Sequence, residues 1–164
     1  MAERDDLTGY IFVALPDPEY EWDATVELVP GRAEEWTEVP AGKVTVGKPV
    51  WILQCGQRAK SGRGFYGLAE TIEPRAPRTD LAWLRYAVRF DKPILLPSGP
   101  NQTHAALGAV RWQDNRLPIL LGIRPDQNGV TRPCGFVGTV FPVGGQDEHR
   151  IRQLLPGLPP LSRG

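Results

Sequence analysis

The sequence is poor in the residues that build metal sites and disulfide frameworks. It holds two cysteines, Cys55 and Cys134, and two histidines, His104 and His149, and these do not form a ligand set with zinc spacing. We therefore expect no metal and no cofactor. We expect both cysteines to be free thiols in a reducing cytoplasm; a single disulfide between them is the alternative.

Long apolar runs and catalytic motifs are also lacking. No apolar run approaches the ~18 residues that cross a bilayer, and the charged start, Met-Ala-Glu-Arg-Asp-Asp, is not that of a signal peptide. These absences predict a cytoplasmic protein with no membrane partner. Neither histidine lies beside a suitable nucleophile, and the segment Gly-Gln-Arg-Ala-Lys-Ser-Gly-Arg-Gly lacks the ending of a phosphate-binding loop. The sequence thus predicts a protein that is not an enzyme.

What the chain has in abundance is proline and glycine. Seventeen prolines and eighteen glycines interrupt its 164 residues so often that long helices are excluded over most of it. Short strands with a few short helices, an α+β fold, are expected. The length suits one core, so we predict a flexible N-terminus over 1–8, a single domain over 9–155 and a linker-like tail over 156–164.

The net charge is zero, but the charge is unevenly spread. Residues 1–38 hold eleven acids and two arginines, whereas residues 39–69 hold five cations and no acid. A basic segment favours an anionic partner. The alternative is that the two segments neutralise each other within the fold.

The basic charge gathers in a predicted hairpin. Two apolar runs, 50–53 and 65–72, flank a glycine-rich connection that contains Arg58, Lys60 and Arg63. Such cations can pair with phosphates. Together with five tryptophans that could stack on bases, they favour nucleic acid as the partner. Trp51 is expected in the core and Trp112 at the surface.

The remaining pattern predicts several further elements. Arg32–Thr37 is compatible with one helical turn that presents Trp36, although the pattern alone leaves this segment open, and Asp147 is interpreted as the N-cap of the last helix. Strands are expected over 9–15, 81–90, 117–123 and 136–143, and helices over 103–112 and 146–155.

The order of these segments resembles the EVE domain, a PUA-like family, in the versions attached to modification-dependent restriction systems. The resemblance covers residues 9–97 and rests on short motifs kept in order: GYIFVALPDPEYEW, EEWT, VTVGKPVWILQCG, GFYGLAETIEP and LRYAVRFDKPILL. The chain departs from the family pattern at Ile11, Leu15 and Lys48, where the family often has Trp, Asn and Asp.

The resemblance implies a PUA-like β-barrel that binds modified double-stranded DNA and holds a flipped modified base, such as 5-methylcytosine, in an aromatic pocket. Any nuclease would be a separate domain or partner. The implied pocket residues are Trp36, Trp22, Tyr20 and Tyr66, with Asp17 and Asp23 as acceptors for a base amino group. The residues expected at the nucleic-acid backbone are Arg58, Lys60, Arg63 and Arg111. The alternatives are an RNA-modification reader of the same fold, and a protein-interaction or small-ligand module with no nucleic-acid role.

Overall fold

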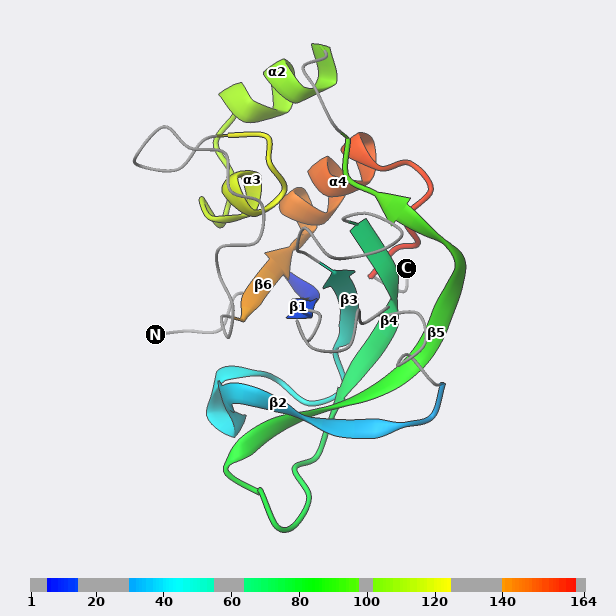
Figure 1. The fold of residues 1–164 in the computed structure, drawn as a ribbon. Coiled ribbons are helices and arrows are strands. Elements are labelled where there is room, and N and C mark those ends of the chain that lie inside the picture. The colour runs from blue at the N-terminus through cyan, green and yellow to red at the C-terminus, as the bar shows by residue number, and fades with distance from the viewer. Residues whose placement is uncertain (1–5, 15–29, 55–63, 98–101, 125–139, 162–164) are drawn as a thin grey trace, which may run out of the picture.

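The computed structural model describes residues 6–14, 30–54, 64–97, 102–124 and 140–161. Within these ranges the chain is a mixed α+β fold (Figure 1). Its strands are β1 (Leu7–Ala14), β2 (Ala33–Pro40), β3 (Pro49–Gln54), β4 (Gly64–Ile72), β5 (Leu81–Leu95) and β6 (Phe141–Gly144). Its helices are the 3-10 turn η1 (Ala41–Lys43), α2 (Gln102–Ala109), α3 (Leu117–Leu120) and α4 (Gly145–Leu154).

The six strands form one mixed sheet in the order β2-β5-β4-β3-β1-β6. β1 and β3 are parallel, with Tyr10 opposite Val50. The other strand pairs described are antiparallel. Successive side chains of β1 and β3 point to opposite faces of the sheet, so each strand contributes apolar side chains to both faces.

The predicted central hairpin is confirmed. β3 and β4 pair antiparallel from Pro49 opposite Glu70 to Gln54 opposite Gly64. The strand predicted over 81–90 is also confirmed, and it continues to Leu95 because the apolar run 94–96 pairs with the start of β4. The structure thus merges two predicted segments into one long strand.

Two of the expected elements are wrong. The segment predicted as a helical turn lies in β2, where Glu35 faces Trp83 of β5, and the cross-strand pairing overrides the local helical composition. The strand predicted over 117–123 begins with the short helix α3 instead. Pro118 lies in the first turn of α3, where the missing N–H of proline costs no hydrogen bond.

The last helix is confirmed, but its predicted cap is wrong. The residue that precedes α4 is Gly144, and Asp147 lies in the first turn with its side chain fully buried. Its carboxylate oxygens accept hydrogen bonds from the backbone N–H groups of Gln113 and Asp114, both at 2.9 Å. Asp147 therefore ties α4 to the segment that precedes α3.

Each face of the sheet carries its own apolar cluster. The first cluster, which includes Trp51 and Trp112, packs against α2, α3 and α4, which gather on one side of the molecule (Figure 1). The second cluster includes Tyr10, Val50 and Trp36 and has no helical member. The prediction for Trp51 is confirmed, whereas Trp112 is 2% exposed and its predicted place at the surface is wrong.

The sheet is strongly curled. In the strand order, β2 and β1 are separated by four strand-to-strand spacings. In a flat sheet, at ~4.8 Å per spacing, these two strands would lie roughly 19 Å apart. Yet the rings of Trp36 in β2 and Phe12 in β1 meet edge to face, with centroids 5.2 Å apart. The second cluster therefore fills the concave side of a sheet that bends back on itself.

Both chain ends differ from expectation where they are described. Part of the predicted flexible N-terminus is ordered, because β1 begins at Leu7 and the carbonyl of Asp6 accepts a hydrogen bond from Gly145. Residues 156–161, which we name the C-terminal strap, are packed rather than linker-like. Leu158 and Leu161 are each 1% exposed, and the carbonyl of Pro159 accepts a hydrogen bond from the Trp51 indole.

Candidate functional site

The second apolar cluster brings together two residues predicted for a base pocket. Trp36 and Tyr66 both belong to it, and their side chains are 2% and 1% exposed. Trp36 reaches the cluster from β2 and Tyr66 from β4, on strands separated by β5. The curl of the sheet explains how these side chains share one interior.

Burial limits what these rings can do in the described conformation. The Trp36 indole already packs against Phe12, so a base could stack on it only after this packing changed. The role of Trp36 and Tyr66 as pocket walls stays a prediction. The other predicted pocket residues, Tyr20, Trp22, Asp17 and Asp23, lie outside the described residues.

A carboxylate that the sequence reasoning missed borders this cluster. The Tyr86 hydroxyl donates a hydrogen bond to the Glu34 carboxylate, and Arg32 lies 3.9 Å from the same carboxylate. Glu34 is two residues before Trp36, so the two side chains share a face only if the segment is extended. Because the local composition predicts a helical turn here, the sequence alone does not reveal this arrangement.

The predicted backbone-binding cations fall into two groups. Arg58, Lys60 and Arg63 lie outside the described residues, in the connection between Gln54 and Gly64, which are partners at the end of the hairpin. Arg111 is described and exposed, two residues after the end of α2. It is neither a member of the second cluster nor among the hydrophobic residues packed against that cluster.

Arg111 has basic neighbours that the sequence reasoning missed. The Arg150 guanidinium donates to the Arg111 carbonyl and lies over the Trp112 ring, 5.8 Å from its centroid. Arg124 donates to the carbonyls of Gly108 and Val110 at the C-terminal end of α2, where a cation is favoured by the helix dipole. Three arginines thus surround this helix end. They are 39 residues apart in sequence at most, and no local pattern links them.

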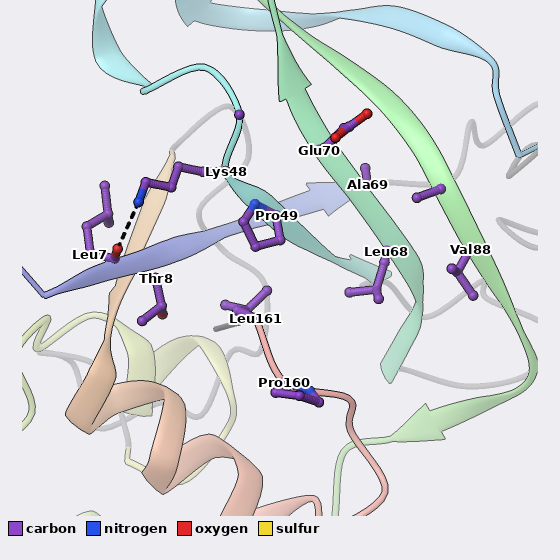
Figure 2. A pocket seen from close by; sticks show the side chains of 12 residues that line it. Leu7, Thr8, Lys48, Pro49, Leu68, Ala69, Glu70, Val88, Pro160 and Leu161 are labelled. Carbon is purple, nitrogen blue, oxygen red and sulfur yellow. Dashed lines mark hydrogen bonds between the residues drawn. The ribbon is translucent and has the colours of Figure 1, made fainter. Parts of the chain in front are cut away.

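A groove opens on the sheet away from these arginines. It has a volume of about 460 Å³ and lies between the starts of β1 and β3, the middle of β4 and β5, and the C-terminal strap (Figure 2). Its wall is about equally polar and apolar, and the apolar side chains that line it include Leu7, Pro49, Leu68, Val88, Pro160 and Leu161. Two charged side chains, Lys48 and Glu70, also line it.

Hydrogen bonds hold the entrance to β3 rigidly beside this groove. The buried hydroxyl of Thr71 donates to the Thr45 carbonyl at 2.6 Å and accepts from the Lys48 N–H at 2.9 Å. Gly47 closes the turn with φ +89°, a conformation that favours glycine. The Lys48 ammonium then reaches across to β1 and donates to the Leu7 carbonyl at 3.3 Å (Figure 2).

Two ion pairs shift pKa values elsewhere on the molecule. A bidentate hydrogen bond from Arg78, at 3.0 and 2.9 Å, holds the pKa of the exposed Asp80 carboxyl below its ordinary value. The hydrogen bond to the buried Asp114 carboxylate, at 2.7 Å, raises the pKa of Arg116 above its ordinary value. Both pairs join residues two apart in a turn, which indicates a structural role.

The part of the chain that the structure describes has neither a metal-ligand cluster nor a spanning helix. Its residues contain no group of three or more His, Cys, Asp or Glu side chains that could hold a metal ion. Cys55 and Cys134 lie outside these residues. None of the described helices is long and apolar enough to cross a membrane.

Comparison with other proteins adds no assignment. No family model, no curated protein and no solved structure matches this chain.

Proposed function

We propose that this chain is a modified-base reader with a PUA-like barrel, which binds DNA and holds a flipped modified cytosine. It would serve as the recognition module of a modification-dependent restriction system, with any nuclease in a separate domain or partner. An RNA-modification reader of the same fold is the alternative within this proposal. The motif resemblance over residues 9–97 supports the family part of this proposal.

The observation that carries the proposal is the contact between Phe12 and Trp36. Rings from strands four positions apart meet with centroids 5.2 Å apart, so the mixed sheet is strongly curled. This curl supports the fold that the resemblance implies. Two of the residues proposed for the base pocket, Trp36 and Tyr66, belong to the second cluster on the concave side of this sheet.

The hairpin supplies the second support. Arg58, Lys60 and Arg63 belong by sequence to the segment that connects Gln54 of β3 to its partner Gly64 of β4. Such cations would hold phosphates while a base is out of the duplex. Flipping costs a few kcal/mol, and stacking on an aromatic ring returns ~1–3 kcal/mol per base.

The direct test is a binding titration with matched oligonucleotides. Duplexes that differ only in the methylation of one cytosine are titrated at several salt concentrations, beside single-stranded RNA with the same modification. Preference for the modified duplex supports the DNA reader, and preference for modified RNA supports the alternative. No salt-dependent binding to any of these probes would contradict the proposal.

Variants distinguish the residues proposed to bind the DNA backbone from those proposed to recognise the base. Replacing Arg58, Lys60 and Arg63 by Gln should weaken binding to modified and unmodified duplexes alike, and lower the salt slope by roughly one for each phosphate that is no longer neutralised. Arg75→Gln, which changes an exposed arginine after β4, is the matched control. Unchanged affinity in the triple variant would show that the hairpin does not meet the backbone.

The pocket is tested at the predicted aromatic residues. Tyr20→Ala, Trp22→Ala and Trp36→Phe should each reduce the preference for the modified base and leave binding to unmodified duplex nearly unchanged. Trp36→Phe is chosen because Trp36 is buried, and truncation to Ala would cost about 3–5 kcal/mol of stability. If all three folded variants discriminate as well as the parent, the pocket lies elsewhere.

A specific observation favours a second function, a small-ligand or protein-interaction module. Trp36, Trp51 and Trp112 are all 2% exposed or less, so three of the five tryptophans serve the core. Under this second proposal the basic segment balances the acidic start of the chain. The oligonucleotide titration distinguishes the two, because this module would bind none of the probes.

A further inference from the structure

One side of the molecule keeps its negative charge inside. We name it the helical side, and it consists of residues 102–124 and 140–161, which contain α2, α3 and α4 (Figure 1). These two ranges hold three acids, all of which are 7% exposed or less: Asp114, Asp147 and Glu148. Within the helical side, therefore, no carboxylate is exposed to solvent.

Each of these buried carboxylates has a partner within the fold. Asp147 accepts hydrogen bonds from two backbone N–H groups of the segment before α3. Asp114 pairs with Arg116 at 2.7 Å, and Glu148 accepts a hydrogen bond from the Leu161 N–H at 3.1 Å. These acids stabilise the helical side from within and leave its surface to other groups.

The surface charge of the helical side is mainly positive. Its two ranges hold five arginines and no lysine, and none of the five is buried. From outside these ranges Asp6 adds one exposed carboxylate, which accepts a hydrogen bond from the Gln113 side chain. The planar guanidinium group matches the geometry of phosphate better than an ammonium does, so an all-arginine surface favours phosphate as the partner.

Three of these arginines lie together at the C-terminal end of α2. We name Arg111, Arg124 and Arg150 the arginine cluster. Arg124 donates to the Val110 carbonyl at 3.1 Å, and Arg150 donates to the carbonyl of the next residue, Arg111. Consecutive Cα atoms are only ~3.8 Å apart, so the two guanidinium groups meet the same point of the chain. The exposed side chain of Arg111 starts from that point.

Two of the three guanidinium groups are held in place and keep donors in reserve. Within the described residues, the hydrogen bonds of Arg124 use only its Nη2 nitrogen and those of Arg150 only its Nη1 nitrogen. A guanidinium group has five N–H donors, so each retains donors for an anion. Asp147 lies 3.8 Å from Arg150 and offsets part of its charge, but Arg111 and Arg124 have no such acid among the described ion pairs.

We propose that the arginine cluster binds the phosphodiester backbone of nucleic acid, in addition to the cations of the hairpin. The inference rests on the proposed binding of nucleic acid, but it does not require that a modified base is read. Arginine forks can each meet two phosphate oxygens, and such contacts carry no sequence information. The cluster should therefore add affinity for modified and unmodified duplexes alike.

The first test uses the unaltered protein with two polyanions. A short unmodified DNA duplex and poly-glutamate are titrated while the arginine Nε–H signals are followed by NMR. We expect the duplex to shift the signals of Arg111, Arg124 and Arg150 saturably, and poly-glutamate to need a higher concentration. If poly-glutamate shifts them at an equal or lower concentration, the cluster serves an acidic protein segment and the proposal is wrong.

Variants then measure what the cluster contributes. Arg111→Gln removes one charge but keeps the backbone carbonyl that Arg150 binds, so the fold should be unaffected. It should bind the unmodified duplex about tenfold more weakly at ~0.1 M salt and lower the salt slope by roughly one. The double variant Arg111→Gln/Arg150→Gln should lower the slope by roughly two, and the single variant suffices if the double variant unfolds.

The matched control changes an arginine far from the cluster. Arg75 is exposed in the connection between β4 and β5, at the opposite end of the molecule from α2 (Figure 1). Arg75→Gln removes the same charge and should bind the duplex as the parent does. An equal loss in this control would show that only net charge matters, which would overturn the cluster as a site.

The outcomes separate this inference from the proposed function. Parental affinity in the cluster variants, with the preference for a modified base retained, would overturn the cluster and leave the reader proposal intact. Weaker binding and a lower slope in these variants, in a protein that ignores methylation, would uphold the cluster and contradict the reader. A protein that binds no duplex at all would overturn both.

Discussion

Gly64, the first residue of β4, lies where that strand passes close to the backbone of β5. A Cβ at this position would lie 2.3 Å from the carbonyl oxygen of Ile94 and 2.7 Å from the Cα of Leu95, both backbone atoms. Gly64→Ala should therefore destabilise the protein by about 1–3 kcal/mol, as overpacking does. Chemical denaturation followed by circular dichroism measures this.

The control is a glycine with open space around it. At Gly42, in η1, an added Cβ would meet no atom within 4 Å. Gly42→Ala should leave stability unchanged or raise it by up to ~1 kcal/mol, because it restricts the unfolded chain. Equal effects at both positions would mean that the approach of β4 to β5 is less close than described.

The Asp80 carboxyl gives a prediction on pH. Its hydrogen bond from Arg78 lowers its pKa in the folded state, so the stabilisation is present above the ordinary pKa of the unfolded chain and is lost as pH falls through the folded value. An NMR titration of Asp80 should have its midpoint below that of a model aspartate. In Arg78→Gln the midpoint should return towards the ordinary value, and an unchanged midpoint would rule out the pairing.

Two tryptophans, Trp51 and Trp112, show which buried positions can be predicted from the sequence and which cannot. The position of Trp51 in the middle of a predicted strand correctly predicts its place in the core. Arg111 and Gln113 flank Trp112 and suggest a surface position, yet its indole donates to the Leu107 carbonyl at 2.8 Å within the core. In an irregular segment no fixed periodicity relates the position of a residue to a buried or an exposed face. Polar neighbours therefore do not predict that a residue in such a segment is exposed.

The C-terminal strap is the element whose role was least expected. Leu158 is 1% exposed and packs in the first cluster, and Arg152 donates to its carbonyl at 3.0 Å. Leu158→Ala should lower the free energy of unfolding by about 2–5 kcal/mol, the cost of emptying a buried leucine site. Thermal and chemical unfolding measure it.

The matched control lies in the same strap. Pro156 is exposed, so Pro156→Ala should change stability by no more than about 0.5 kcal/mol. A linker would tolerate both substitutions equally well. Equal effects of the two substitutions would indicate that residues 156–161 behave as the linker that the sequence predicts.

Among the elements, those with strong periodicity or clear turn signals were predictable. The hairpin of β3 and β4, the strand β5 and the helix α4 follow from such patterns. β2 was missed because its charged composition is helical and only its pairing with β5 makes it a strand. α3 was missed because a short apolar run fits a buried strand as well as a helix. The first miss arises from a contact that is distant in sequence, and the second from an ambiguous local pattern.

At the scale of the whole molecule, both apolar clusters share one sheet. Trp36 belongs to one cluster and Trp112 to the other, and the strands between them contribute residues to both. We therefore expect the two sides to unfold together in one cooperative transition. Fluorine NMR of fluorotryptophan-labelled protein should give the same denaturation midpoint for both indoles. Separate midpoints would show that each side of the sheet is stable without the other.

The position of β1 in the sheet has a consequence for how the chain is made. β1 lies between β3, which it pairs with in parallel, and β6, so its two neighbours come from distant parts of the chain. A ribosome has therefore finished β1 some 130 residues before it releases the strand that covers its second edge. Until then this edge offers unpaired backbone groups, which makes the nascent chain most vulnerable to association with its neighbours late in translation.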